Sequence, residues 1–249
     1  MIKKKRLIFE LENVGIDYGV NDALKVKKLE IHPGTIYGIV GTIGSGKTTL
    51  LNLLAGYEKE SSGVLLYDGN TYSKNWLGQV KQNENVFSTT DPIHNGNGKT
   101  ISSYISKKFP KKKNLIQNRY FKKSGFKNLW KRKINEISTA ELNWFGMILA
   151  CECDPRVLLI DDYGIDFNIA MEKDFRSSLI KMNRSLGTTI ILSAPSEIYL
   201  KHFVSVLIFL DHGHISRIRT GYSKHSKHSR IEHNKKRYNT KKRKQYTKR

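Results

Sequence analysis

The sequence TIYGIVGTIGSGKTTLLNLLAG, residues 35–56, is the stretch that decides the fold. Its first six residues form an apolar run with the length and composition of a buried parallel strand. The run leads into a glycine-rich segment with the spacing G-x-x-x-x-G-K-T, and leucines at helical spacing follow. A strand, a glycine-rich loop and a helix in this order form the context that a phosphate-binding loop requires, although the motif alone can also arise by chance.

The chemistry of this loop follows from its residue types. Glycine lets the backbone wrap closely around a phosphate, and successive N–H groups at the helix start present partial positive charge. We expect Lys47 to reach the β- and γ-phosphates of a nucleotide and Thr48 to bind Mg²⁺ through its hydroxyl. The residues expected around the phosphates are Gly41, Thr42, Gly44, Ser45, Gly46, Lys47, Thr48 and Thr49.

A second apolar run, RVLLIDD at residues 156–162, ends in two acids. A phosphate loop needs a carboxylate that helps to hold Mg²⁺, and an acid at the end of a buried strand is the usual source. We therefore expect Asp161 to act as a metal ligand. Taken alone, a strand that ends in acids could also be an ordinary edge strand.

With these elements in order, residues 7–218 resemble the ATP-binding subunits of ATP-binding-cassette (ABC) transporters. The resemblance implies an α/β fold: a P-loop NTPase with a mixed-sheet core, an antiparallel β subdomain and an inserted helical subdomain. It implies ATP and Mg²⁺ as cofactors. Tyr18 would stack on adenine, and Gln82 would match the Q-loop glutamine that touches Mg²⁺ and senses the membrane partner. Ser138, in the signature slot 137–141, would act in trans on the nucleotide of a second subunit.

Several positions depart from the family pattern. The signature reads Ile137-Ser-Thr-Ala-Glu141 and lacks both glycines; read without the family, it is a capping box that begins a helix. Asp162 stands where the family has its catalytic glutamate, and Pro195 replaces a histidine that contacts the γ-phosphate. The D-loop ends in Asn168 instead of aspartate. The residues expected to take part in catalysis are Lys47, Gln82 and Asp162, and we expect slow hydrolysis because the Asp162 carboxylate is one methylene shorter.

The formal net charge of +22 is concentrated in two segments. Residues 99–133 hold 13 basic and no acidic side chains, residues 221–249 hold 12 basic and one acidic, and the rest of the chain has a net charge of −2. The first segment interleaves lysines with aromatic residues, namely Tyr104, Phe109, Tyr120, Phe121, Phe126 and Trp130. We interpret these aromatics as core faces of amphipathic helices; nucleic-acid stacking platforms are the alternative.

The predicted organisation is an ATPase domain at 1–220, with the helical subdomain at 83–136, and a basic, disordered tail at 221–249. The tail could tether the chain to anionic lipid or nucleic acid, or act only as a solvated solubility tail. No apolar run is long enough to span a bilayer, and the N-terminus lacks the apolar core of a secretory signal. The two cysteines, Cys151 and Cys153, fit a reducing compartment.

The first hypothesis is an ATP-binding subunit of an ABC transport complex, peripheral on the cytoplasmic face of the membrane. Its expected partners are a transmembrane permease and a second ATP-binding subunit, identical or different. A nucleic-acid-associated ABC ATPase is the rival, and a regulatory protein that binds ATP without hydrolysing it is a third interpretation.

Overall fold

The computed structural model describes residues 6–19, 22–122 and 126–221, and the phosphate-loop strand lies inside its central sheet. β3 (Ile36–Val40) is buried along its whole length. It pairs in parallel with β7 (Thr189–Ala194) on one side and β8 (Val206–Asp211) on the other. A short, largely apolar run therefore forms a central strand, as the sequence predicted.

Among the described residues, the sheet has nine strands in the order β4-β1-β2-β9-β8-β3-β7-β6-β5. Beyond β7 it continues in parallel through β6 (Val157–Ile160) to β5 (Val86–Ser88). Its other end is built by antiparallel pairs of β8 with β9, β1 with β2 and β1 with β4. The strands of that end are β1 (Phe9–Asp17), β2 (Asp22–Ile31), β4 (Ser62–Tyr67) and β9 (His214–Thr220).

Helix α1 (Lys47–Ala55) begins directly at the phosphate loop and packs on one face of the sheet. Leu50, Leu53 and Leu54 are fully buried there, together with side chains of β1 and β2 and alternate residues of the central strands. Because side chains alternate along a strand, the remaining central positions face the other side. Those positions pack in a second apolar cluster with α5 (Thr139–Glu152) and α6 (Ile169–Leu186).

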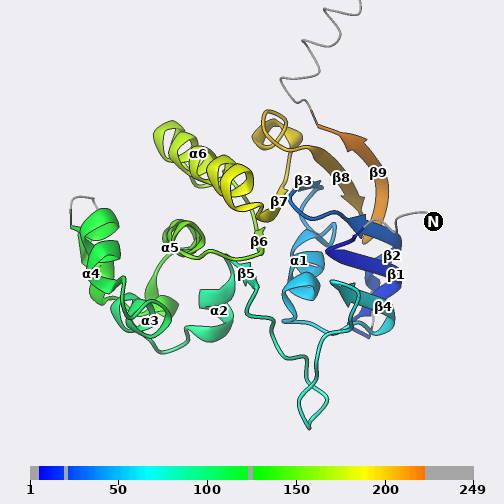
Figure 1. Cartoon of the computed structure of the whole chain (residues 1–249), viewed down its shortest axis with the longest axis horizontal. Coiled ribbons are helices and arrows are strands. Elements are labelled where there is room, and N and C mark those ends of the chain that lie inside the picture. The colour runs from blue at the N-terminus through cyan, green and yellow to red at the C-terminus, as the bar shows by residue number, and fades with distance from the viewer. Residues whose placement is uncertain (1–5, 20–21, 123–125, 222–249) are drawn as a thin grey trace, which may run out of the picture.

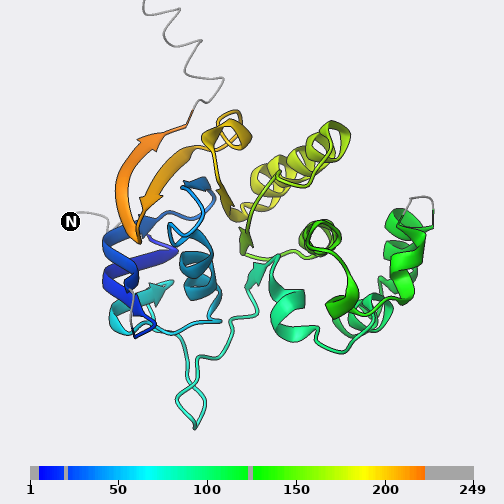
Figure 2. The ribbon, with the colours of Figure 1, turned by 180° about the vertical axis from the view of Figure 1, so that it is seen from behind.

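The helical subdomain lies beside the parallel end of the sheet (Figures 1 and 2). It comprises short helices that lead into α5, namely α2 (Asp91–Asn95), α3 (Ile101–Lys108), α4 (Lys113–Ile116), η1 (Gln117–Phe121), η2 (Lys127–Lys131) and η3 (Ile134–Glu136). The predicted range of 83–136 takes in the edge strand β5, which pairs with β6 and so belongs to the sheet. The boundaries of the subdomain stay a prediction.

The aromatic residues of the basic segment belong to the core of this subdomain. Tyr104, Phe121 and Trp130 are buried, and Phe109, Tyr120 and Phe126 pack against the same cluster while partly exposed. Their interpretation as core residues is confirmed, because all six rings belong to or pack against one apolar cluster.

A last short helix, η4 (Glu197–Tyr199), connects β7 to β8. The predicted tail at 221–249 lies outside the described residues, apart from Gly221. None of the helices in the described part of the chain combines the length and the apolar composition that crossing a membrane requires.

Candidate functional site

The side chain of Lys47 is folded back into the phosphate loop. Its Nζ donates hydrogen bonds to the backbone carbonyls of Gly41 and Thr42, each at 2.9 Å, and the residue is only 7% exposed. A buried ammonium group needs partners, and here the loop itself provides them. The positive charge therefore lies at the centre of the loop, where a phosphate group would bind.

The backbone of the loop needs glycine at Gly46, and within the described part of the chain the loop leaves the Ser45 hydroxyl without a partner. Gly46 has a φ of 96°, and a Cβ there would lie 2.9 Å from the carbonyl oxygen of Ala23. The Ser45 hydroxyl is buried and makes no hydrogen bond with any described residue. A buried hydroxyl without a partner is costly, so this loop is arranged to bind a further polar group.

Thr48 and Asp161 lie together at the first turn of α1. The Thr48 hydroxyl donates to Oδ2 of Asp161 at 2.7 Å, and the Ser193 hydroxyl donates to the other oxygen, Oδ1. Residues from the start of α1 and from β7 therefore both bind the carboxylate of Asp161, which follows β6. A hydroxyl and a carboxylate are oxygen ligands of the kind that Mg²⁺ prefers.

Asp162 follows at the same sheet edge in a left-handed conformation, with a φ of 48°. Aspartate tolerates this region better than most residues. Its backbone N–H donates to the Ser193 hydroxyl at 2.9 Å. Burial and the negative charge of Asp161 raise the pKa of the Asp162 carboxyl above its usual value. A carboxylate with a raised pKa is a better proton acceptor, which suits a general base.

The hydroxyl groups at the carboxyl end of β5 were not predicted from the sequence. The Thr89 hydroxyl accepts the backbone N–H of Asp161 at 3.2 Å, and the hydroxyl oxygens of Ser88 and Thr90 lie 2.8 Å apart. Because β5 runs parallel to β6, the residues after both strands meet at one edge. The three-residue strand VFS was too short to reveal this placement from the sequence.

The structure does not bring Gln82 to this site, and its expected contact with Mg²⁺ needs correction. Gln82 precedes β5 and lines a cavity of about 360 Å³ with Asp154 and Pro155, which precede β6. It therefore lies at the amino ends of the parallel strands, whereas Asp161 lies at their carboxyl ends. Its side-chain oxygen accepts a 3.3 Å hydrogen bond from Asn95. The Thr89 hydroxyl, not Gln82, lies beside Asp161.

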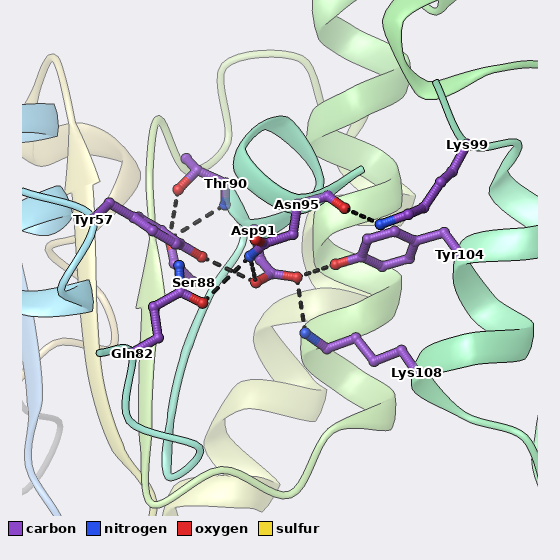
Figure 3. Close-up of polar contacts among 9 residues, drawn as sticks. All are labelled: Tyr57, Gln82, Ser88, Thr90, Asp91, Asn95, Lys99, Tyr104 and Lys108. Atoms are coloured by element: carbon purple, nitrogen blue, oxygen red, sulfur yellow. Dashed lines mark hydrogen bonds and ion pairs between the residues drawn. The ribbon is translucent and has the colours of Figure 1, made fainter. Parts of the chain in front are cut away.

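The same cavity contains a buried carboxylate, Asp91, at the junction between the sheet and the helical subdomain (Figure 3). Asp91 accepts hydrogen bonds from Tyr57, which follows α1, at 3.1 Å and from Lys108 on α3 at 2.8 Å. Tyr104 and Asn95 donate to it as well. Burial raises the pKa of Asp91, but the bonds from Lys108 and Tyr104 outweigh burial and hold it below the usual range.

Tyr18 lies at the end of the antiparallel region and is 61% exposed. Its hydroxyl donates to Glu58 at 2.5 Å, and partial burial together with Glu58 raises the pKa of Tyr18 to about 12. An exposed ring fixed at its hydroxyl end offers a free aromatic face. This arrangement leaves the stacking of adenine on Tyr18 a prediction.

Ser138 begins helix α5 in a capping box, as the residues alone predicted. Its hydroxyl accepts the backbone N–H of Glu141 at 3.3 Å, while the Glu141 carboxylate accepts the Ser138 N–H at 2.7 Å. These hydrogen bonds hold the pKa of Glu141 below its usual value. Thr139 and Ala140 follow with exposed side chains, and the role of Ser138 in trans stays a prediction.

The residues present fit a magnesium nucleotide. The loop has a lysine at its centre, a buried hydroxyl without a partner, and backbone N–H groups at the start of α1. Thr48 and Asp161 provide oxygen ligands 2.7 Å apart. Phosphate-binding and cation-binding groups therefore lie at one sheet edge, beside the half-buried carboxylate of Asp162.

Comparison with known proteins agrees with this geometry. Residues 24–163 match the family model described as "ABC transporter". The spermidine/putrescine import ATP-binding protein PotA of Mesoplasma florum is 25% identical over 221 residues, which cover 86% of this chain and 61% of that protein. The chain thus spans about three fifths of the length of this relative. The tungstate uptake system ATP-binding protein TupC of Peptoclostridium acidaminophilum is 26% identical, covering 82% of this chain and 95% of TupC.

A solved structure shares the fold. It is a dimeric ATP-binding cassette in a post-hydrolysis state bound to ADP and Pi, and it is 18% identical to this chain. The alignment covers 85% of this chain and 98% of that one, with a TM-score of 0.63. The phosphate loop, the strand that ends at Asp161 and the matched family model lead to one conclusion: this chain belongs to the ABC transporter family.

Proposed function

We propose that this chain is an ATP-binding subunit of an ABC transporter, and that it binds Mg-ATP and hydrolyses it slowly. The contact of Thr48 with Asp161 at 2.7 Å carries the proposal, because it joins the phosphate loop to the acidic strand end. Lys47, already buried at the centre of the loop, would exchange its carbonyl partners for phosphate oxygens. Tyr18 would contact the adenine ring.

The chemistry that we propose uses few side chains of this chain. Mg²⁺, held through Thr48 and Asp161, would neutralise negative charge on the β- and γ-phosphates. Asp162 would accept the proton of the attacking water at a carboxylate oxygen, since its raised pKa makes it a stronger base. Ser193 would keep Asp161 and the Asp162 backbone in position through its two hydrogen bonds.

Slow turnover follows from three departures from the family pattern. The carboxylate of Asp162 is one methylene shorter than glutamate, and a displacement of ~1 Å can cost ~100-fold in rate. Pro195, which follows β7, offers neither an imidazole nor a backbone N–H to the γ-phosphate. Thr139 and Ala140 stand at two signature positions where the family has glycine, so their Cβ atoms would crowd a nucleotide bound by a second subunit.

The proposed partners are a transmembrane permease and a second ATP-binding subunit. We expect the second subunit to face the phosphate loop, with Ser138 acting on its nucleotide. The permease would contact the helical subdomain, and the chain would be peripheral on the cytoplasmic face of the membrane. The two curated relatives are named for import and for uptake, which favours an uptake system. Contact of residues 221–249 with anionic lipid is also a proposal.

The test compares Mg-ATP binding and turnover by the purified chain and by two variants. Lys47→Ala should abolish binding, and Asp162→Asn should keep binding while turnover falls at least about 100-fold. Failure of the wild-type chain to bind Mg-ATP would contradict the proposal. Binding without measurable turnover by the wild-type chain would instead favour the regulatory interpretation, and adding a candidate partner subunit would then test whether hydrolysis is restored.

Nucleic-acid association remains the rival function, and salt dependence separates it from transport. Binding to a random oligonucleotide would be compared with and without residues 221–249. A steep salt dependence that survives removal of the tail would favour the rival, because it would place phosphate contacts on the folded domain.

A further inference from the structure

A narrow hairpin, residues 74–80, extends from the body of the molecule between β4 and β5 (Figures 1 and 2). Lys74 and Val80 form an antiparallel bridge, and the Lys81 N–H donates to the Ser73 carbonyl at 2.8 Å. Neither the phosphate loop nor Asp161 and Asp162 contact this segment through any described hydrogen bond. The function proposed above leaves the hairpin without a role.

The turn of the hairpin is held by Asn75. Its side-chain oxygen accepts the backbone N–H groups of Leu77 at 3.0 Å and Gln79 at 2.9 Å, and its amide donates to the Gln79 side chain at 2.9 Å. The backbone N–H groups of Asn75 and Gly78 complete the turn with bonds to Gln79 and Asn75. Such a network fixes the tip in one conformation, so little further ordering is needed when the tip binds.

This ordered turn exposes two large apolar side chains at its tip. Trp76 is 91% exposed and Leu77 is 60% exposed. The other two tryptophans, Trp130 and Trp144, are only 9% and 6% exposed. Single apolar side chains on a surface need no explanation, but adjacent ones held at the tip of a structured hairpin indicate a contact surface.

The charge around the tip is positive. Residues 69–83 contain Lys74 and Lys81, both exposed, and no acidic residue; the exposed Glu84 follows them, outside the hairpin. Asp68, just before this segment, already binds the Arg156 guanidinium through two hydrogen bonds of 2.9 and 3.0 Å. The hairpin therefore combines an apolar tip with positive charge behind it.

We propose that the 74–80 hairpin contacts an anionic lipid surface. Trp76 and Leu77 enter the interfacial layer, where a ring with an apolar body and a polar N–H is favoured, and Lys74 and Lys81 contact the headgroups. A lipid surface is favoured over a protein partner because a convex tip of two side chains is far smaller than the ~800 Å² that each partner of a stable protein interface buries. The inference rests on the membrane location proposed above.

The fluorescence of Trp76 tests the proposal directly. Because Trp130 and Trp144 are already buried, a change in emission on mixing the full chain with vesicles reports mainly on Trp76. Vesicles of phosphatidylglycerol and phosphatidylcholine should shift the emission to shorter wavelength, and brominated acyl chains in those vesicles should quench it. Vesicles of phosphatidylcholine alone should change it far less.

Variants separate the hairpin from the basic tail. The double variant Trp76→Ala and Leu77→Ala should reduce the partition of the chain into anionic vesicles by about tenfold or more. Lys74→Ala or Lys81→Ala should each reduce it by about fivefold. Ile169→Ala, which changes an equally exposed residue at 90% on α6, is the matched control and should leave partition unchanged.

Two outcomes would overturn the proposal. Sedimentation with anionic vesicles while the Trp76 emission stays unchanged would assign lipid binding to the tail alone. Quenching of Trp76 only in the presence of a permease subunit would assign the tip to a protein partner. Mg-ATP binding, measured in parallel, should be the same in the hairpin variants, so failure here is distinguishable from failure of the proposed ATPase function.

Discussion

The hydroxyl oxygen of Ser193 lies 2.9 Å from the backbone nitrogen of Asp162 and accepts its hydrogen. The same hydroxyl donates to the Asp161 carboxylate, and Ser193 is completely buried. One side chain on β7 therefore fixes both the expected metal ligand and the expected general base.

Ser193→Ala should weaken Mg²⁺-dependent nucleotide binding and turnover by about 10- to 150-fold, since a hydrogen bond to a charged group contributes ~1.5–3 kcal/mol. Titration with Mg²⁺ at fixed ATP measures the effect, and ATP binding in the presence of a chelator should change much less. Ser177→Ala, which removes a serine hydroxyl on the exposed side of α6, is the control. Equal Mg²⁺ affinity in Ser193→Ala and wild type would contradict a positioning role for Ser193.

Substitution of Gln82 should have little effect on Mg-ATP affinity, whereas substitution of Thr89 should lower the stability of the fold. Gln82→Ala should leave Mg-ATP affinity within about twofold of wild type, because Gln82 lies at the amino ends of the strands. Thr89→Val keeps the shape but leaves the buried Asp161 N–H without its acceptor, at a cost of ~1–3 kcal/mol in stability. Isothermal titration and thermal unfolding distinguish the two variants. A large loss of Mg²⁺ affinity in Gln82→Ala would restore Gln82 as a metal ligand.

Asp91→Asn should lower the free energy of unfolding by ~2–4 kcal/mol at pH 7, because it removes the charge that Lys108 and Tyr104 bind in a buried site. The pKa of Asp91 is below its usual range in the folded state. Its stabilising effect is therefore fully present above the unfolded-state pKa, near 4, and is lost as pH falls through the folded-state value.

The difference between Asp91→Asn and wild type should consequently be constant from pH 7 to about 5 and shrink at lower pH. Urea unfolding at several pH values measures it, with the exposed Asp174→Asn on α6 as the control. A difference that grew on acidification would mean that the sign of the Asp91 pKa shift is wrong.

Much of this fold could be predicted from local sequence. Three features formed as expected, because neighbouring residues determine each of them. They are the apolar strand β3, the start of α1 at the G-x-x-x-x-G-K-T motif, and the strand β6 that ends before Asp161. The capping box of Ser138 and Glu141 could also be predicted, because both partners lie within one helical turn.

Contacts across the sheet could not be predicted in the same way. Gln82 was misassigned because a strand of three residues leaves little local signal of where it begins. Gln82 lies four positions before β5, whereas the expected glutamine follows the strand. Ser193 was overlooked because a serine inside an apolar strand carries no local signal. Its role depends on β6 and β7 being neighbours, which brings it to Asp161 from 32 residues away.

Strands β4 and β5 are the two outer edges of the nine-stranded sheet, so the segment that carries the 74–80 hairpin connects one edge to the other. A cut at Trp76 by a protease specific for aromatic residues would leave two fragments whose strands interleave. The first fragment would contribute β3, and the second would contribute β7 and β8 on either side of it. The nicked chain should therefore stay assembled without a covalent link, which makes this tip a natural position for dividing the protein into two co-expressed halves.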